Sequence, residues 1–136
     1  MNQLPAIITQ IETDGHVSLI TLEALHTSFS ALVIDTPETA AYLQTGEQVQ
    51  MLFKETEMSI GKYLSGGLSL RNRFPARITK VEQGTVLTKV LLDFNGHTLC
   101  SLITTPSALA LNLKPDDAVE GLVKSNEITL LHSSSF

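Results

Sequence analysis

The chain has 136 residues, of which 43% are hydrophobic and 17% are charged, and its formal net charge is -5. This apolar composition excludes an intrinsically disordered chain, and the length suits one ordinary domain or two small ones. The acidic balance, together with Trp 0, Tyr 2 and Phe 5, argues against a nucleic-acid-binding protein, which usually has a basic face and rings on which bases stack.

The sequence also argues against a secreted or membrane protein. The segment from Met1 to Pro5 has neither basic residues nor a long apolar run, so we expect no signal peptide. No apolar stretch approaches the roughly 20 residues that span a bilayer. Cys100 is the single cysteine, and we expect it to pack as a small buried side chain rather than act as a nucleophile. These features predict a cytoplasmic protein that has no membrane partner.

The chain repeats itself with a spacing of about 70 residues. The segment 2–9 returns as 72–79, with Asn, Pro, Ala, Ile and Thr at the same places. Further pairs keep the spacing, with slips of one residue near turns, to the end of the chain: Glu12/Glu82, Val17/Val86, Val49/Val119, Lys54/Lys124 and Glu57/Glu127. We predict two copies of one module, and their bounds are 1–62 and 69–131, with a linker at 63–68 and a flexible tail at 132–136.

The first copy is predicted to be mostly β-structure. It begins with a strand at Asn2, and Thr36-Pro37-Glu38 indicates the start of a short helix because Thr caps helices and Pro suits the first helical position. Two further strands are predicted at 49–53 and 58–60.

The second copy begins with the corresponding strand at Asn72. A largely buried strand is predicted at 86–93, where apolar side chains occupy most positions. Asn95-Gly96 follows, and because both residues tolerate positive φ, it predicts a tight hairpin to a strand at 98–103.

The rest of the second copy predicts one helix and two strands. Thr105 is expected to cap a helix at 105–109, with Pro106 at its first position. Strands are expected at 119–123 and 128–131. Five strands and one short helix in about 65 residues predict an all-β fold: two tandem OB-type five-stranded barrels, each with one short helix.

Hydrogen-bond donors gather at two places in the second copy. Ser69-Leu70-Arg71-Asn72 precedes its first strand, and Lys124-Ser125-Asn126 follows its fourth. In a closed barrel the first and fourth strands can be neighbours, so the two clusters can meet. Alternation along the fourth strand places Lys124 outside the barrel, at a turn whose backbone N–H groups also suit an anion. The pattern indicates an oxyanion site, and the alternative is a solvated basic edge with ordinary turn chemistry.

Other chemistry is not indicated by the sequence. The four histidines lack the spacing of metal ligands, and no Gly-rich phosphate loop is present. No set of nucleophile, base and acid stands out. We therefore expect neither an enzyme nor a metal bound directly by side chains.

At the donor clusters the sequence resembles the molbindin family of Mop or TOBE domains, which are OB-type modules that bind molybdate or tungstate. The family pattern has Ser-Ala-Arg-Asn before the first strand, Thr after the third and Lys-Ala-Ser after the fourth. This chain has Ser69-Leu70-Arg71-Asn72, Ile103-Thr104 and Lys124-Ser125-Asn126. The resemblance covers nearly the whole chain and is to the tandem, di-Mop form.

The resemblance implies one oxyanion site in the second copy. Its residues would be Ser69, Leu70, Arg71, Asn72, Thr104, Lys124 and Ser125. In this interpretation four side chains (Ser69, Arg71, Lys124 and Ser125) contact the anion, and backbone N–H groups near Leu70 and Arg71 add donors. Asn72 braces the turn, and Thr104 reaches across a module or subunit interface.

The first copy departs from the family pattern. A secondary site there would use Asn2 and Lys54. Only Asn2 is left of the opening motif, Glu55 follows Lys54 where a small residue is expected, and Ile34 stands in the place of Thr104. A carboxylate repels a dianion, so we expect this site to be partly degenerate.

The implied function is cytoplasmic molybdate or tungstate binding, for storage, buffering or homeostasis of molybdenum. The resemblance also implies a homo-oligomer, with a trimer favoured over a dimer. The alternative is a tandem OB-type regulatory or accessory module, as in a transporter ATPase or a regulator, without oxyanion storage. The sequence leaves open the preference between the two anions and the number of sites.

Overall fold

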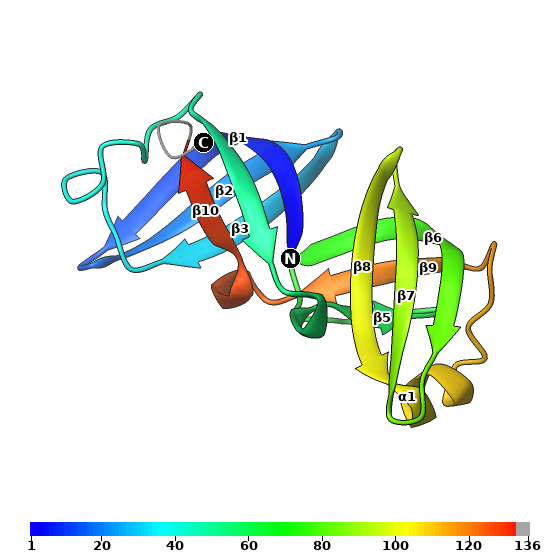
Figure 1. Cartoon of the computed structure of the whole chain (residues 1–136). Coiled ribbons are helices and arrows are strands. Elements are labelled where there is room, and N and C mark those ends of the chain that lie inside the picture. Colours follow the sequence, from blue (N-terminus) through cyan, green and yellow to red (C-terminus); the bar gives the residue numbers. More distant parts are fainter. Residues whose placement is uncertain (133–136) are drawn as a thin grey trace.

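The computed structural model describes residues 1–132 and consists of two curled antiparallel sheets of five strands each (Figure 1). The first sheet contains, in spatial order, β10 (Thr129–His132), β4 (Gln48–Phe53), β1 (Asn2–Asp14), β2 (Val17–Ala24) and β3 (Thr27–Val33). The second contains β5 (Ser59–Gly61), β9 (Ala118–Val123), β6 (Asn72–Gln83), β7 (Leu87–Phe94) and β8 (His97–Thr104). The predicted all-β fold of two OB-type barrels is confirmed.

The long first strand of each sheet is bent at the same place in the repeat. The pairing of β1 with β2 shifts register between Ile8 and Gln10, and that of β6 with β7 shifts between Ile78 and Lys80. Such an irregularity bends a strand and increases its twist. It lets β1 and β6 each pair with two neighbours while the sheet curls into a barrel.

The fifth strands are exchanged between the two halves of the chain. β5 comes from the first half but pairs with β9, and β10 comes from the second half but pairs with β4. The repeat predicted that each half supplies its own fifth strand, and this was wrong. After β4 and β9, the 3₁₀ helices η1 (Glu55–Glu57) and η2 (Ser125–Glu127) lead the chain across to the other barrel (Figure 1).

The predicted module bounds therefore mark the repeat in the sequence, while each barrel contains residues from both halves. His132, predicted to begin the tail, is the last residue of β10 and pairs with Val49. The rest of the predicted tail, 133–136, lies outside the described residues.

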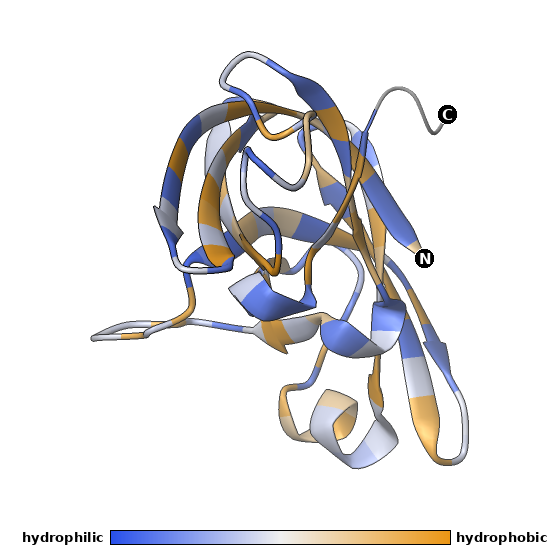
Figure 2. Ribbon diagram, turned by 90° about the vertical axis from the view of Figure 1, so that its left-hand side faces the viewer, coloured by the Kyte–Doolittle hydropathy of each residue, from blue (hydrophilic) through white to orange (hydrophobic). Residues whose placement is uncertain are grey.

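The two barrels share one hydrophobic core. Apolar and polar residues alternate along the strands (Figure 2), which places one face of each sheet inside. Four buried phenylalanines meet between the sheets: Phe29 of β3 stacks on Phe74 of β6 at 4.4 Å, and Phe53 and Phe94 lie 5.4 and 5.3 Å from Phe74. Because these rings come from both sheets, neither barrel completes its core alone.

Two buried asparagines also join the barrels. At the start of β6, Asn72 Oδ1 accepts from Ser30 N of β3 at 2.7 Å, and Asn72 Nδ2 donates to Ser30 O at 2.9 Å. At the start of β1, Asn2 makes the same two bonds to Cys100 of β8, each at 2.8 Å. We call each of these pairs of hydrogen bonds a clamp. The two clamps are related by the 70-residue repeat, so the halves pack as a pseudo-symmetric pair.

The predicted hairpin turn and the predicted helix of the second half are both present, but the helix has a different cap. Asn95 and Gly96 have φ of 48° and 89° and join β7 to β8 as predicted. The helix α1 (Thr105–Ala110) is present, but its N-cap is Thr104, one residue earlier than expected.

The helix predicted to begin at Thr36 in the first half does not form. Thr39 Oγ1 accepts from Thr36 N at 2.8 Å and the segment is a series of turns. Ser and Thr hydroxyls commonly divert backbone groups from helical bonding in this way, whereas Ala108, Leu109 and Ala110 in α1 favour a helix.

The linker is anchored at its beginning. Lys62 Nζ donates to the carbonyl oxygens of Leu111 and Asn112, each at 3.1 Å, and lies 3.0 Å from Asp117 Oδ2. The Lys62 side chain is only 9% exposed. Since β5 and β6 both flank β9, this anchor fixes one end of the segment that presents Ser69 and Arg71. No helix of the described residues is long and apolar enough to cross a membrane.

Candidate anion-binding site

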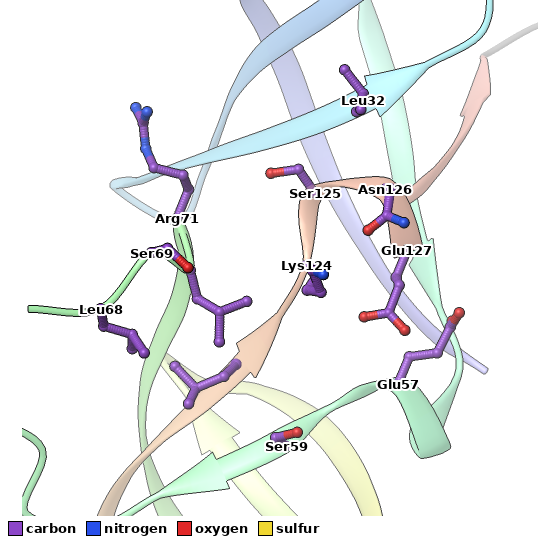
Figure 3. Close-up of a pocket in the computed structure, with 12 residues that line it drawn as sticks. Leu32, Glu57, Ser59, Leu68, Ser69, Arg71, Lys124, Ser125, Asn126 and Glu127 are labelled. Carbon is purple, nitrogen blue, oxygen red and sulfur yellow. The ribbon is translucent and has the colours of Figure 1, made fainter.

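A cavity of about 660 Å³ lies where the two barrels meet, beside the start of β6 and the end of β9 (Figure 3). It is lined by Leu32, Glu57, Ser59, Leu68, Ser69, Leu70, Arg71, Leu122, Lys124, Ser125, Asn126 and Glu127. Five of the seven residues proposed for the main site are among them: Ser69, Leu70, Arg71, Lys124 and Ser125.

Strand pairing brings the two donor clusters together. β6 runs antiparallel to β9, and Asn72 pairs with Val123. The residues just before β6 therefore lie beside those just after β9. This neighbour relation is the one that the barrel prediction required, and it holds even though the fifth strands are exchanged.

Three donor side chains in the cavity wall have no acceptor among residues 1–132. Ser69, Arg71 and Lys124 are exposed, and none of the three side chains forms a hydrogen bond or an ion pair within that range. Figure 3 shows the Arg71 guanidinium turned away from Lys124, which keeps the two like charges apart. The neighbouring Arg73 is already occupied, because its guanidinium binds Glu120 at 2.9 and 2.6 Å.

Ser125 contributes a hydroxyl that links the cavity to the first barrel. Its Oγ lies 2.6 Å from the Oγ of Ser30 on β3. Ser125 is half-buried, and Figure 3 places it between Lys124 and the strand that carries Leu32. The cavity is therefore built from both barrels.

Two carboxylates form the opposite side of the cavity. Glu57 and Glu127 come from η1 and η2 and lie near each other in Figure 3. Glu57 Oε1 accepts from Lys54 N at 2.8 Å, so it is held by its own turn. The Glu127 carboxylate has no hydrogen bond or ion pair within residues 1–132. An anion would be attracted to the side with Arg71 and Lys124 and repelled from the side with the two acids.

Asn72 and Thr104 do not face this cavity. Asn72 is fully buried, and its amide is used by the clamp on Ser30. Thr104 caps α1, because its Oγ1 accepts from Ser107 N at 3.3 Å and donates to Ser107 Oγ at 2.8 Å. It lines a different cavity, of about 680 Å³, with residues that include Thr56, Leu102 and Leu111. Its counterpart in the first half, Ile34, is 84% exposed.

The secondary site expected at Asn2 and Lys54 has no free donor cluster. The Asn2 amide is committed to Cys100. Glu55 replaces Ser125 in the repeat, and its Oε1 binds the Met1 ammonium group at 2.7 Å. That hydrogen bond lowers the pKa of the Glu55 carboxyl. The Glu55 carboxylate, paired with the Met1 ammonium group, therefore lies where the repeat would place the anion.

The sequence interpretation missed Leu32 and Glu57, which line the cavity, and Ser30, which contacts Ser125. These residues lie in the first half and carry no motif, and only the exchange of strands brings them to the cavity. Cys100, which was expected to be buried, is half-buried, and burial raises the pKa of its thiol. Within the described residues no group of three His, Cys, Asp or Glu side chains could hold a metal ion.

The fold and the cavity define a class of small all-β binding modules, here arranged as an exchanged tandem pair. A family model described as the TOBE domain matches residues 68–130. The matched residues include Ser69, Arg71, Lys124 and Ser125.

The chain is also similar to solved structures. Over 96% of its length and 95% of the other chain, it shares 20% identity and a TM-score of 0.90 with the cytoplasmic molybdate-binding protein ModG, crystallised with molybdate bound. A molybdate-binding protein from Sporomusa ovata is 36% identical over 48% of this chain and 98% of its own, with a TM-score of 0.48. The likeness to ModG shows that the fold is shared over both barrels. No sequence of a curated protein matches this chain.

Proposed function

We propose that this protein binds molybdate or tungstate in the cavity between its barrels and serves in the cytoplasm to store, buffer or regulate molybdenum. It acts as a binding protein and not as an enzyme. The observation that carries the proposal is the meeting of Ser69, Arg71 and Lys124, whose side chains have no acceptor among the described residues, with the Ser125 hydroxyl in one cavity. The match of residues 68–130 to the TOBE domain model and a fold shared with a molybdate-binding protein support it.

The chemistry of the donors matches the chemistry of the ligand. Molybdate and tungstate at neutral pH are tetrahedral dianions without a proton, so every oxygen accepts. Two hydroxyls, an ammonium and a guanidinium supply only donors toward such a ligand, and charge-assisted bonds are the strong ones. Hydrogenphosphate carries a proton that would face a donor, and an unpaired donor costs about 1–3 kcal/mol.

The roles of the remaining residues follow from their positions. Backbone N–H groups near Leu70 and Arg71 add donors, and Asn72 positions β3 through its clamp. Thr104 lines a different cavity, so it would reach the anion of another copy rather than that of its own chain. The site formed by Asn2 and Lys54 is proposed to stay empty because Glu55 already fills it.

We also propose that the chain forms a homo-oligomer, a trimer in preference to a dimer. Several large apolar side chains are exposed on a single chain, among them Ile34 at 84%, Val86 at 69% and Leu109 at 59%. Burial of these side chains between copies would remove apolar surface from water.

Native mass spectrometry with and without molybdate tests both parts of the proposal. We expect an oligomer that gains molybdate, and calorimetry should give much weaker binding of phosphate. Comparable affinities for phosphate and molybdate would contradict the donor argument. An oligomer that takes up neither molybdate nor tungstate would favour a regulatory or accessory module instead.

A further inference from the structure

Ser30 is a buried serine whose hydroxyl contacts the candidate site from the other barrel. It lies on β3 of the first barrel, is 5% exposed, and has its Oγ 2.6 Å from that of Ser125. No motif points to it. Its backbone is held on both sides by the Asn72 amide, so the place of its hydroxyl is fixed by the residue that ends the Ser69–Asn72 motif.

The direction of the bond between the two hydroxyls follows from their surroundings. Ser125 Oγ is the one partner of the Ser30 hydroxyl among the described residues. If Ser125 donated to Ser30, the buried Ser30 proton would lack an acceptor, which is unfavourable. If Ser30 donates, its proton is satisfied, and the Ser125 proton is left free to point into the cavity.

We propose that Ser30 is a positioning residue of the oxyanion site, which donates to Ser125 so that Ser125 presents its own proton to the ligand. This inference rests on the proposed function. The chain of hydroxyls has one favourable direction, from the first barrel toward the anion, and hydrogen bonds in such a chain strengthen one another. It also occupies one of the two acceptor lone pairs of Ser125 Oγ and orients its proton toward the cavity.

The repeat supplies a comparison within the same chain. The counterpart of Ser30 is Cys100, which is held by Asn2 in the same way, and the counterpart of Ser125 is Glu55. A thiol is a weak donor, and a carboxylate has no proton to present at neutral pH. The first half lacks the hydroxyl pair. There the Glu55 carboxylate takes the place proposed for the anion and pairs with the Met1 ammonium group.

The consequence is a change of selectivity as well as affinity when Ser30 is altered. Without the Ser30 hydroxyl, the Ser125 hydroxyl is no longer held in one orientation, and its oxygen can turn an acceptor site toward the cavity. A protonated oxyanion such as hydrogenphosphate can then donate to Ser125, whereas molybdate cannot use that site. The ratio of molybdate to phosphate affinity should therefore fall.

A double-mutant cycle tests this inference by calorimetry with molybdate and with phosphate. We expect Ser30→Ala to weaken molybdate binding roughly three- to tenfold and to lower the molybdate-to-phosphate ratio. In a Ser125→Ala background the same change should have no further effect, because Ser30 acts through Ser125. Ser30→Cys should be intermediate. Cys100→Ala is the matched control, with wild-type affinity, and thermal melting should show that Ser30→Ala remains folded.

The outcomes separate the two proposals. Wild-type protein that binds neither molybdate nor tungstate overturns the proposed function and this inference with it. Wild-type binding with an equal loss from Ser30→Ala in both backgrounds, or with an unchanged selectivity ratio, overturns the inference alone, since a purely structural role gives that result.

Discussion

Lys124 and Lys54 occupy equivalent places in the repeat but have different surroundings. Lys124 lines the cavity with Ser69, Arg71 and Ser125, whereas Glu55 next to Lys54 is already paired with the Met1 ammonium group. We expect Lys124→Ala to weaken molybdate binding roughly ten- to hundredfold, because a hydrogen bond to a charged group is worth about 1.5–3 kcal/mol. Lys54→Ala should change it little. Calorimetric titration of both variants measures the difference.

Each other result of that titration has a definite meaning. Equal losses in the two variants would show that both halves bind the anion. Full binding in both would place the site elsewhere, and a loss confined to Lys54→Ala would contradict the assignment of the degenerate half.

Glu127 is a second residue whose surroundings lead to a prediction. Its carboxylate lines the cavity without a bond of its own among residues 1–132. Removing this negative charge with Glu127→Gln should tighten molybdate binding about threefold at low ionic strength, with less effect at high salt. Glu38→Gln, at an exposed turn, is the control for a change in net charge. An unchanged affinity in Glu127→Gln would mean that the anion lies beyond the reach of this carboxylate.

The Lys62–Asp117 pair predicts an acid dependence of stability. The hydrogen bond from Lys62 lowers the pKa of Asp117 below its ordinary value of 3.8. The folded state therefore favours the ionised carboxylate, and the contribution is present above about pH 4 and is lost as the pH falls through the lowered pKa. Asp117→Asn should lower the melting temperature more at pH 7 than at pH 2, relative to wild type. A difference that is the same at both pH values would contradict this.

At the scale of elements, periodicity and turn residues predicted the strands well. β4, β7, β8 and β9 lie within one residue of their predicted bounds because each has a local pattern. The pairing of β5 and β10 with the opposite barrels was not predictable. The repeat alone is compatible both with a fifth strand that stays in its own barrel and with one that is exchanged between the barrels. For the same reason Ser30 was missed, while Ser69, Arg71, Lys124 and Ser125 were found from motifs that lie at the ends of neighbouring strands.

The phenylalanine cluster leads to a prediction at the same scale. Phe74 of β6 contacts Phe29 and Phe53 of the first sheet and Phe94 of its own. Phe74→Ala should lower the free energy of unfolding by about 3–5 kcal/mol, and urea unfolding should remain a single transition because both barrels use this ring. Glu38→Ala, at an exposed turn, is the control. Two separate transitions in the Phe74→Ala protein would mean that the barrels fold independently.

At the scale of the whole molecule, the exchanged strands and the shared core make the chain one cooperative unit rather than two domains on a tether. Each barrel depends on the other half for its fifth strand and for aromatic rings in its core. The cavity is likewise divided, with Leu32 and Glu57 from one half and Arg71, Lys124 and Ser125 from the other. Binding and folding are therefore expected to depend on the same contacts between the halves.

Cutting the linker tests this dependence. A protease site placed at the exposed Gly66-Gly67 leaves the anchor at Lys62 intact. After cleavage we expect the two fragments to elute together under native conditions and to keep molybdate binding within about twofold of the uncut protein, because β5 and β10 stay paired across the cut. The same cut in the Phe74→Ala protein should release the fragments at a lower urea concentration. Fragments that separate without denaturant would show that the linker, and not the exchanged strands, holds the halves together.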